Sequence, residues 1–329
     1  MVDFKVFKGS KGSKIVEGTS HREVGPKEVL VKVTHSGLCG TDIHYKGADM
    51  VLGHEGVGIV EEVGSNVTMF KKGDRAGWGY EHDACGHCKQ CLRGTETLCP
   101  QRKMYGDADL DQGSMGAYAV WKEDFLFQVP EGMKSEDAAP LMCGGATVFN
   151  SMQQYNIRST DRVGIIGVGG LGHLAIQFAS RMGCQVVVFS GTESKKDEAM
   201  KLGATEFYAT KGVSELEVPE PIDHLLVTTA QQPDWNMYLR IMAAGGTIFP
   251  LTVSMEDLKM PYMPIILKEL KVQGSLVAAR QIHREMLEFA AKHDIRPIIQ
   301  TFPMTLDGIN KAFETLENGQ MRYRGVLVA

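Results

Sequence analysis

The sequence predicts an α/β protein in which a small β-rich domain accompanies a doubly wound parallel sheet. Short runs with a period of two fill the first part of the chain, whereas strand-like and helix-like segments alternate in the second. A glycine-rich turn joins the first strand and helix of that second part. The length of 329 residues exceeds the usual size of one domain. We place the β-rich domain at residues 1–145, with 279–329 returning to it, and the parallel-sheet domain at 146–278.

The strands of the β-rich part follow from alternation along the chain. Val29, Val31 and Val33 alternate with other side chains, which is the period of a half-buried strand. Residues 57–63 and 117–121 have a similar pattern, and Gly-Asp and Val-Pro pairs separate the segments. We therefore expect short strands joined by long loops.

The elements of the second part follow from apolar runs and helical stripes. Helical spacing predicts a helix over 171–178 that ends near Gly183, and another over 194–202 that ends at Gly203. Strands that alternate with helices predict a parallel sheet covered on both faces. The expected strands are residues 162–166, 185–189, 222–227 and 246–251, and the return segment holds helices at 283–293 and 306–318 and a strand at 323–329.

The composition limits the classes of partner. The chain carries 35 basic and 40 acidic residues, so its net charge is −5. Because there is neither a basic excess nor a basic run, we expect no nucleic acid and no anionic membrane as partner. No apolar stretch is long enough to span a bilayer, and the first residues contain no apolar signal core, so we expect a cytoplasmic protein.

Four of the seven cysteines fall within fifteen residues, and we call residues 85–99 the knuckle. Cys85, Cys88, Cys91 and Cys99 can supply the four thiolates of a tetrahedral zinc ion from one tight loop. Because no coordination position stays open, this zinc is expected to be structural. An iron–sulfur cluster is the alternative, and His82 and His87 are expected to be solvated loop residues. Cys184 is expected to be an inert buried thiol.

A second metal site is predicted from residues in glycine-rich settings. Cys39 lies in GLCGTD, His54 in LGHEG and Cys143 in MCGGAT. Two thiolates and one imidazole with a vacant fourth position form a catalytic zinc set. Asp42 is a candidate to hold the His54 ring, or else caps the turn after Cys39. Glu55 is a candidate for an occasional fourth ligand.

A dinucleotide motif follows the strand at 162–166 and opens the next helix. In this context glycines let the backbone approach a pyrophosphate at the helix N-terminus. The motif residues are Gly167, Gly169, Gly170, Leu171 and Gly172.

The next strand ends in Ser190-Gly191-Thr192 rather than in an acidic residue. Without a carboxylate there, two hydroxyls with Lys195 or Lys196 can bind a 2′-phosphate, which favours NADP over NAD. The alternatives are that Glu193 meets the ribose of NAD, or that Ser194 and Asp197 form a capping box beside solvated lysines.

Taken together, these motifs resemble the zinc-containing medium-chain alcohol dehydrogenases, in particular their cinnamyl-alcohol-dehydrogenase-like branch. The matching pieces cover nearly the whole chain in the family's order, and they are CGTDIH, GHEGVG, GDRAG, the knuckle, AAPLMCGGATVF, GVGGLGH, FSGTESKKDEAMKLGA and MRYRGVLV. The resemblance implies a GroES-like catalytic domain and a Rossmann domain. It also implies interconversion of primary alcohols and aldehydes with NADP(H), in a homodimer.

The resemblance assigns roles to particular residues. Cys39, His54 and Cys143 match the catalytic zinc ligands, with Glu55 beside them. Thr41 matches the hydroxyl that passes the proton, and His44 the histidine at the far end of that relay, although a solvated loop histidine is the alternative. The resemblance places Arg322 near the carboxylates around the metal. Val277 and Ala278, which follow the GSL turn, are candidates to lie beside the nicotinamide. Candidate pocket-lining residues are Trp78, Tyr105, Met115 and Trp121.

One segment departs from the family's pattern. Only nine residues separate His44 from His54, and this connection is shorter than is usual in the family, where it lines the mouth of the active site. The shortening predicts a wider mouth that accepts bulky or aromatic aldehydes. The rival functions are an NAD-linked polyol or secondary-alcohol dehydrogenase and a catalytically inactive cofactor-binding homologue.

Overall fold

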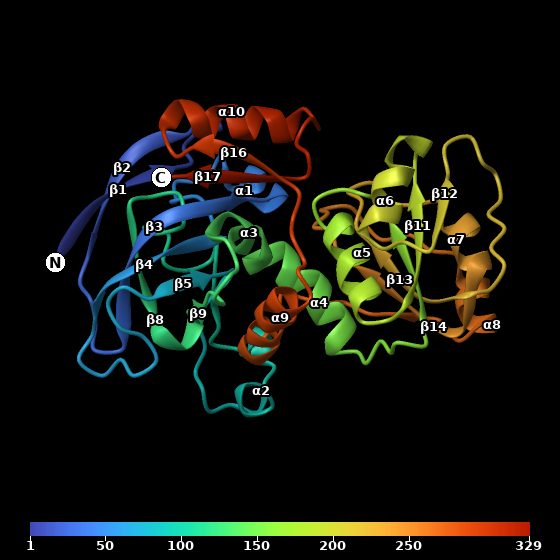
Figure 1. Cartoon of the computed structure of the whole chain (residues 1–329), viewed down its shortest axis with the longest axis horizontal. Coiled ribbons are helices and arrows are strands. Elements are labelled where there is room, and N and C mark those ends of the chain that lie inside the picture. The colour runs from blue at the N-terminus through green and yellow to red at the C-terminus, as the bar shows by residue number, and fades with distance from the viewer. The chain divides into compact units, whose positions relative to one another are not determined.

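The computed structural model describes all residues from Met1 to Ala329, which form two compact units (Figure 1). The first unit comprises Met1–Ala146 and Val277–Ala329, and the second comprises Thr147–Leu276. The chain thus leaves the first unit once and returns to it. No helix is both long enough and apolar enough to cross a membrane.

The first unit is built on a seven-stranded sheet. Neighbouring strands are antiparallel except for the pair β16–β17. In spatial order the strands are β16 (Ile299–Pro303), β17 (Arg324–Val328), β3 (Glu28–Leu38), β4 (Gly56–Val63), β5 (Arg75–Trp78) and β9 (Phe127–Gln128), with β8 (Tyr118–Lys122) also paired to β3. Two small antiparallel sheets accompany it, β1 (Val2–Lys8) with β2 (Val16–Arg22) and β6 (Glu81–Asp83) with β7 (Lys103–Met104).

Helices of the first unit are short where they carry the candidate site and longer where they cover the sheet. The amphipathic helix α10 (Leu306–Glu317) buries Ile309, Ala312 and Phe313 against apolar side chains of β3 and β17. The other helical segments are α1 (Gly40–Tyr45), α2 (Lys89–Leu92), α3 (Ser135–Pro140), a π-helical turn at Leu141–Gly145, α9 (Arg280–Lys292) and the 3₁₀ turns Glu96–Leu98 and Glu123–Phe125.

The second unit is a six-stranded, all-parallel sheet. Its spatial order is β12 (Glu206–Ala209), β11 (Gln185–Ser190), β10 (Arg162–Ile166), β13 (Ile222–Val227), β14 (Met242–Pro250) and β15 (Lys271–Val272). Strands β11 and β12 are added on one side of β10, whereas β13, β14 and β15 are added on its other side. The carboxyl ends of β10 and β13 are therefore the topological switch point, where doubly wound sheets bind ligands.

Helices connect the parallel strands of this unit. The remaining helical segments are α4 (Ala146–Gln153), α5 (Gly172–Arg181), α6 (Lys196–Leu202), α7 (Trp235–Ile241), α8 (Tyr262–Leu267) and the 3₁₀ turn Glu193–Lys195. Helix α7 packs Trp235, Tyr238 and Leu239 against the apolar side chains of β11 and β13. Gly183 and Gly203 follow helices with φ of 92° and 114°, the left-handed conformation expected at such ends.

The fold class is confirmed, and one local alternative is wrong. Helix α6 begins after Lys195, whose side chain makes no capping bond, so Ser194 and Asp197 do not form a capping box there. The Ser194 hydroxyl instead lies 2.8 Å from that of Thr192.

Candidate functional site

The first unit brings together four potential metal ligands from distant parts of the sequence. The ligand atoms of Cys39, His54, Glu55 and Cys143 all lie within 4.8 Å of one another, and we call these residues the buried cluster. His54 and Glu55 are completely buried, and Cys143 is 7% exposed. The predicted trio and its acidic neighbour are therefore adjacent in space.

Local structure explains how each ligand reaches this place. Cys39 follows β3 and is the N-cap of α1, while His54 and Glu55 come directly before β4, the partner of β3. Cys143 lies in the π-helical turn Leu141–Gly145, and such turns are frequent at functional sites. Sheet pairing and one irregular helix thus converge on the cluster.

Asp42 connects two of the ligands. One carboxylate oxygen, Oδ2, accepts a hydrogen bond from the backbone N–H of Cys39 at 2.9 Å. The other, Oδ1, lies 3.1 Å from His54 Nδ1. Asp42 has no exposed surface, so this contact fixes the ring and leaves Nε2 to face the sulfur atoms. Both sequence interpretations of Asp42, as ring partner and as cap, describe real contacts.

Glu55 is paired with a buried arginine, and this arginine is not the predicted one. The guanidinium of Arg324 bonds to the Glu55 carboxylate, whereas Arg322 is exposed and lies over the Tyr323 ring. The register explains the error, because Gly325 of β17 pairs with Leu38, which places Arg324 beside Cys39. At Gly37 a Cβ would lie 1.9 Å from Glu55 Oε2, so only glycine leaves room for this carboxylate.

The cluster strongly perturbs its own ionisation. The hydrogen bond with Cys143, aided by His54 and Arg324, lowers the pKa of Cys39 well below the usual thiol value, and the same contact raises that of Cys143. Burial lowers the pKa of His54, but Asp42 and Cys39 outweigh it and raise the pKa well above normal. Burial raises the pKa of Glu55 to about 7 against the opposing effect of Arg324.

The cluster has the chemistry of a cation site. His54 Nε2 and Glu55 Oε2 are buried without any hydrogen-bond partner, which is costly for polar atoms. Both belong to residues whose ligand atoms converge with two sulfur atoms, the donor set that zinc prefers. A metal ion held there would satisfy both atoms.

The predicted relay residues lie on the helix that starts at the cluster. Thr41 and His44 are three positions apart on α1 and therefore share a face. The Thr41 hydroxyl lies 3.7 Å from the Cys39 sulfur, and His44 is exposed in the last turn. One end of the pair thus touches the cluster and the other meets solvent.

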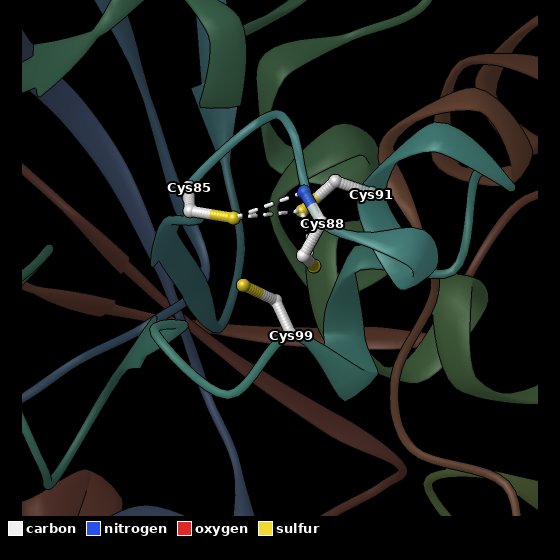
Figure 2. Close-up of side chains that lie close together, drawn as sticks. All are labelled: Cys85, Cys88, Cys91 and Cys99. Carbon is white, nitrogen blue, oxygen red and sulfur yellow. Dashed lines mark hydrogen bonds between the residues drawn. The ribbon is translucent and has the colours of Figure 1, made fainter.

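The knuckle forms a second cysteine cluster (Figure 2), in which Cys99 is buried and the other three cysteines are partly exposed. The four sulfur atoms lie within 4.8 Å of one another, with Cys88–Cys91 at 3.6 Å and Cys85–Cys91 at 3.9 Å. Four thiolates around one zinc ion at bonds of about 2.3 Å stand about 3.8 Å apart, so the loop is already arranged for the ion. All seven cysteines are free of disulfides.

Buried polar contacts hold the knuckle against the rest of the unit. Glu96 Oε1 accepts hydrogen bonds from the Arg280 backbone N–H (2.7 Å) and Nε (2.9 Å) at the start of α9. His82, expected in solvent, is instead 4% exposed and contacts the Trp121 ring and Asp109. The sequence before the knuckle is a strand rather than an open loop, and this buries His82.

The predicted glycine motif occupies the switch point of the second unit. Gly167 follows β10 with φ of 96°, and a Cβ at Gly172 would lie 2.0 Å from the Gly167 carbonyl oxygen. Gly169 has open space beside it, Gly170 is half-buried, and Leu171 is the N-cap of α5. Thr228, directly after β13, donates to the Ile166 carbonyl at 2.8 Å. The turn therefore has the tight shape that lets a pyrophosphate approach the helix.

The structure distinguishes the two lysines of the following turn. Lys195 Nζ donates to the Val168 carbonyl in the glycine motif at 2.6 Å. Lys196 Nζ lies 3.5 Å from Glu193, whose side chain is 63% exposed. Ser190 is buried at the end of β11, and Gly191 and Thr192 are exposed. Lys195 is thus the cation that reaches the motif, and Glu193 forms an exposed ion pair with Lys196.

The candidate pocket-lining residues are core residues. Trp78 and Trp121 pack on each other in one apolar cluster and Met115 lies in another, all at most 2% exposed. Tyr105 is 2% exposed, and its ring packs at a tilt against His54. An apolar residue type alone therefore does not distinguish a pocket-lining residue from a core residue. Val277 is half-buried with φ of 41°, a strained conformation for a β-branched residue.

The fold and the two clusters define a dinucleotide-binding dehydrogenase with two metal centres. An "Alcohol dehydrogenase GroES-like domain" model matches residues 25–131, and a "Zinc-binding dehydrogenase" model matches residues 170–292. The chain belongs to the zinc-containing alcohol dehydrogenase family, and the resemblance seen in its sequence is confirmed. This membership favours zinc over an iron–sulfur cluster.

Relatives cover the chain from end to end. The NADP-dependent alcohol dehydrogenase C 1 of Mycolicibacterium smegmatis is 32% identical over 94% of this chain and 92% of its own. The structure of a cinnamyl alcohol dehydrogenase from Sorghum bicolor matches with a TM-score of 0.92 and 30% identity, over 99% of this chain and 98% of its own. A cinnamyl alcohol dehydrogenase from Helicobacter pylori, complexed with NADP(H), matches with a TM-score of 0.86 and 28% identity over the same shares.

Proposed function

We propose that this protein is a zinc-dependent alcohol dehydrogenase that interconverts primary alcohols and aldehydes with NADP(H). The observation that carries the proposal is the buried cluster, in which two thiols, an imidazole and a carboxylate converge with an unpartnered Nε2. The substrate class is aromatic, unsaturated or medium-chain aldehydes and the matching alcohols.

Cys39, His54 and Cys143 hold the catalytic zinc, with Glu55 as an occasional ligand, and the four knuckle cysteines hold the structural zinc. When bound, the catalytic zinc supplies Lewis-acid polarisation of the substrate oxygen and NADPH supplies the hydride. The Asp42 contacts keep Cys39 and His54 oriented before substrate arrives. Arg324 balances the charge of the thiolates and of Glu55.

Protons are exchanged along one face of α1. The Thr41 hydroxyl, next to the Cys39 sulfur, donates its proton to the product oxygen. It regains a proton through the relay that ends at His44. His44 exchanges protons with water, since its side chain is exposed and the two nitrogens of an imidazole can accept and donate a proton. Replacing His44 is expected to slow turnover without removing metal.

The cofactor is held at the switch point of the parallel sheet. The motif Gly167–Val168–Gly169–Gly170–Leu171–Gly172 would hold the pyrophosphate. Ser190, Gly191, Thr192 and Lys195 would hold the 2′-phosphate of NADP. Lys195 is favoured over Lys196 because it already reaches the motif, whereas Lys196 is paired with Glu193. Val277, at the start of the return segment, is the residue that would meet the nicotinamide when the cofactor is bound.

The nine-residue connection before His54 widens the mouth of the active site, so bulky aldehydes are accepted. The chain acts as a homodimer, supported by exposed apolar side chains on α8, among them Tyr262 (81%) and Leu267 (74%), and by the edge strand β15 that follows α8 in the chain. It works in the cytoplasm, where two sets of metal-binding thiols stay reduced.

An aldehyde panel with NADPH and NADH, run on protein of known metal content, tests this function. We expect turnover with NADPH that exceeds that with NADH and persists as the aldehyde becomes bulkier. Bound NADPH without turnover of any aldehyde would favour the inactive homologue, and falling activity with substrate bulk would contradict the wider mouth.

A further inference from the structure

Two tyrosines contact the His54 ring and a third packs against them, but only Tyr105 also makes a hydrogen bond to the carboxylate that orients the ring. Tyr105 lies on the face of the imidazole, with ring centroids 4.7 Å apart at 35°. Tyr80 meets its edge at 5.4 Å and 85°, and Tyr45 lies 5.2 Å from the Tyr105 ring. The hydroxyls of Tyr45 and Tyr80 face each other at 3.4 Å.

The Tyr105 hydroxyl makes two hydrogen bonds on either side of the shortened connection. It donates to Asp42 Oδ1 at 2.9 Å and accepts from the Gly53 backbone N–H at 2.9 Å. Asp42 precedes the nine-residue segment and Gly53 is its last residue. One buried side chain therefore links Asp42, which lies before the segment, to the last residue of the segment that leads into His54.

The hydroxyl also completes the environment of the carboxylate that orients His54. Asp42 Oδ1 lies within hydrogen-bonding distance of three groups, which are Tyr105 Oη, His54 Nδ1 (3.1 Å) and the Gly53 N–H (3.2 Å). Loss of the Tyr105 hydroxyl would remove one hydrogen-bond donor from the buried oxygen Asp42 Oδ1. The Asp42 carboxylate could then rotate. Tyr105 itself is fixed, since it is 2% exposed and its N–H donates to the Tyr80 carbonyl at 2.8 Å.

We infer that Tyr105 is a positioning residue of the catalytic metal site. Its hydroxyl restrains Asp42 and Gly53 by hydrogen bonds, and its ring restrains the His54 imidazole by packing against it. This inference rests on the proposed function. After α1 ends at Tyr45, no helix or long strand leads to His54, so regular structure does not set the ring. Tyr105, which follows β7 beyond the knuckle, supplies that restraint from outside the segment.

The effect on metal binding follows from this role. Loss of a partner that orients a metal ligand commonly weakens metal binding about 10- to 100-fold. Tyr105→Phe keeps the ring and removes only the hydroxyl, whereas Tyr105→Leu removes both. Tyr45→Phe is the matched control, because it deletes a neighbouring hydroxyl that touches neither Asp42 nor Gly53.

The test compares metal binding by the full-length wild type and the three variants. Zinc content is measured first, then competition with a chromogenic chelator, then the visible spectrum after cobalt replaces the catalytic ion. We expect Tyr105→Phe to retain the knuckle zinc, to bind the second ion about 10- to 100-fold more weakly, and to shift the cobalt bands. Tyr105→Leu should be weaker still, and Tyr45→Phe should match the wild type.

Two results overturn the inference while the proposed function stands. One is a Tyr105→Phe protein with wild-type affinity and cobalt bands, and the other is an equal loss in Tyr45→Phe. A wild-type chain that binds only the knuckle ion is a different failure, because it removes the proposed function and this inference with it.

Discussion

The two cysteine clusters are built in opposite ways. The knuckle takes all four ligands from fifteen consecutive residues, and three of the four cysteines are partly exposed. The buried cluster takes its ligands from three separate segments and depends on Asp42, Arg324 and Tyr105 to aim them. Local chain geometry positions the ligands of the knuckle, whereas tertiary contacts with other buried side chains position the ligands of the buried cluster.

Removing one ligand from each cluster should separate catalysis from stability. We expect Cys143→Ala to lose one zinc ion and at least about 10³-fold in kcat/KM, because the electrophile contributes several kcal/mol. Cys99→Ala should instead lose the knuckle ion and on the order of 4 kcal/mol of unfolding free energy. Metal analysis, steady-state kinetics and urea denaturation distinguish them. Identical outcomes for the two variants would contradict a catalytic role for the buried cluster and a structural role for the knuckle.

The buried ion pair behind the cluster should matter far more than the exposed arginine two residues away. Arg324→Gln leaves Glu55 buried without its cation, which costs about 3–5 kcal/mol. Arg322→Gln, on the exposed side, should change the unfolding free energy by less than about 0.5 kcal/mol. Paired denaturant titrations measure both. A larger loss for Arg322→Gln would return the role to the arginine that the sequence suggested.

What the sequence could predict follows the same division. The knuckle and the glycine motif were predictable because their residues are neighbours in the chain, and β10 has the bounds expected from its apolar run. The arginine was misplaced by two residues because strand register, not composition, decides which one faces Glu55. Tyr105 was expected in a pocket, since no local signal reveals that its phenol reaches back to Asp42.

The lysines that follow β11 give a test of the cofactor site. If Lys195 meets the 2′-phosphate, Lys195→Ala should lose a charge-assisted hydrogen bond worth about 1.5–3 kcal/mol, or roughly 10- to 100-fold in the preference for NADPH over NADH. Lys196→Ala should leave that preference nearly unchanged, because Lys196 is paired with Glu193. Measuring kcat/KM for both cofactors decides between them. An effect confined to Lys196→Ala would reverse the assignment.

A buried histidine on α9 should give the protein a measurable sensitivity to acid. His283 on α9 stacks on Phe127 at 3.8 Å, and burial lowers its pKa to about 3. The unfolded chain takes up a proton below about pH 6.5 and the folded chain does not, so stability falls by up to about 1.4 kcal/mol per pH unit between roughly pH 6.5 and 3.

His283→Leu removes this titration, so the slope of unfolding free energy against pH should become shallower in that range. His21→Leu is the control, since His21 is an exposed histidine on β2. Denaturant titrations at pH 7, 6 and 5 give the slopes. Parallel slopes for the wild type and His283→Leu would show that His283 is protonated in the folded protein.

The most direct test of the account is the number and behaviour of zinc ions bound by the purified wild-type chain. Two ions per chain are expected, with activity lost in step with removal of the one that Cys143→Ala also lacks. A chain that carries a single ion, bound by the knuckle and unaffected by Cys143→Ala, would contradict a catalytic metal in the buried cluster.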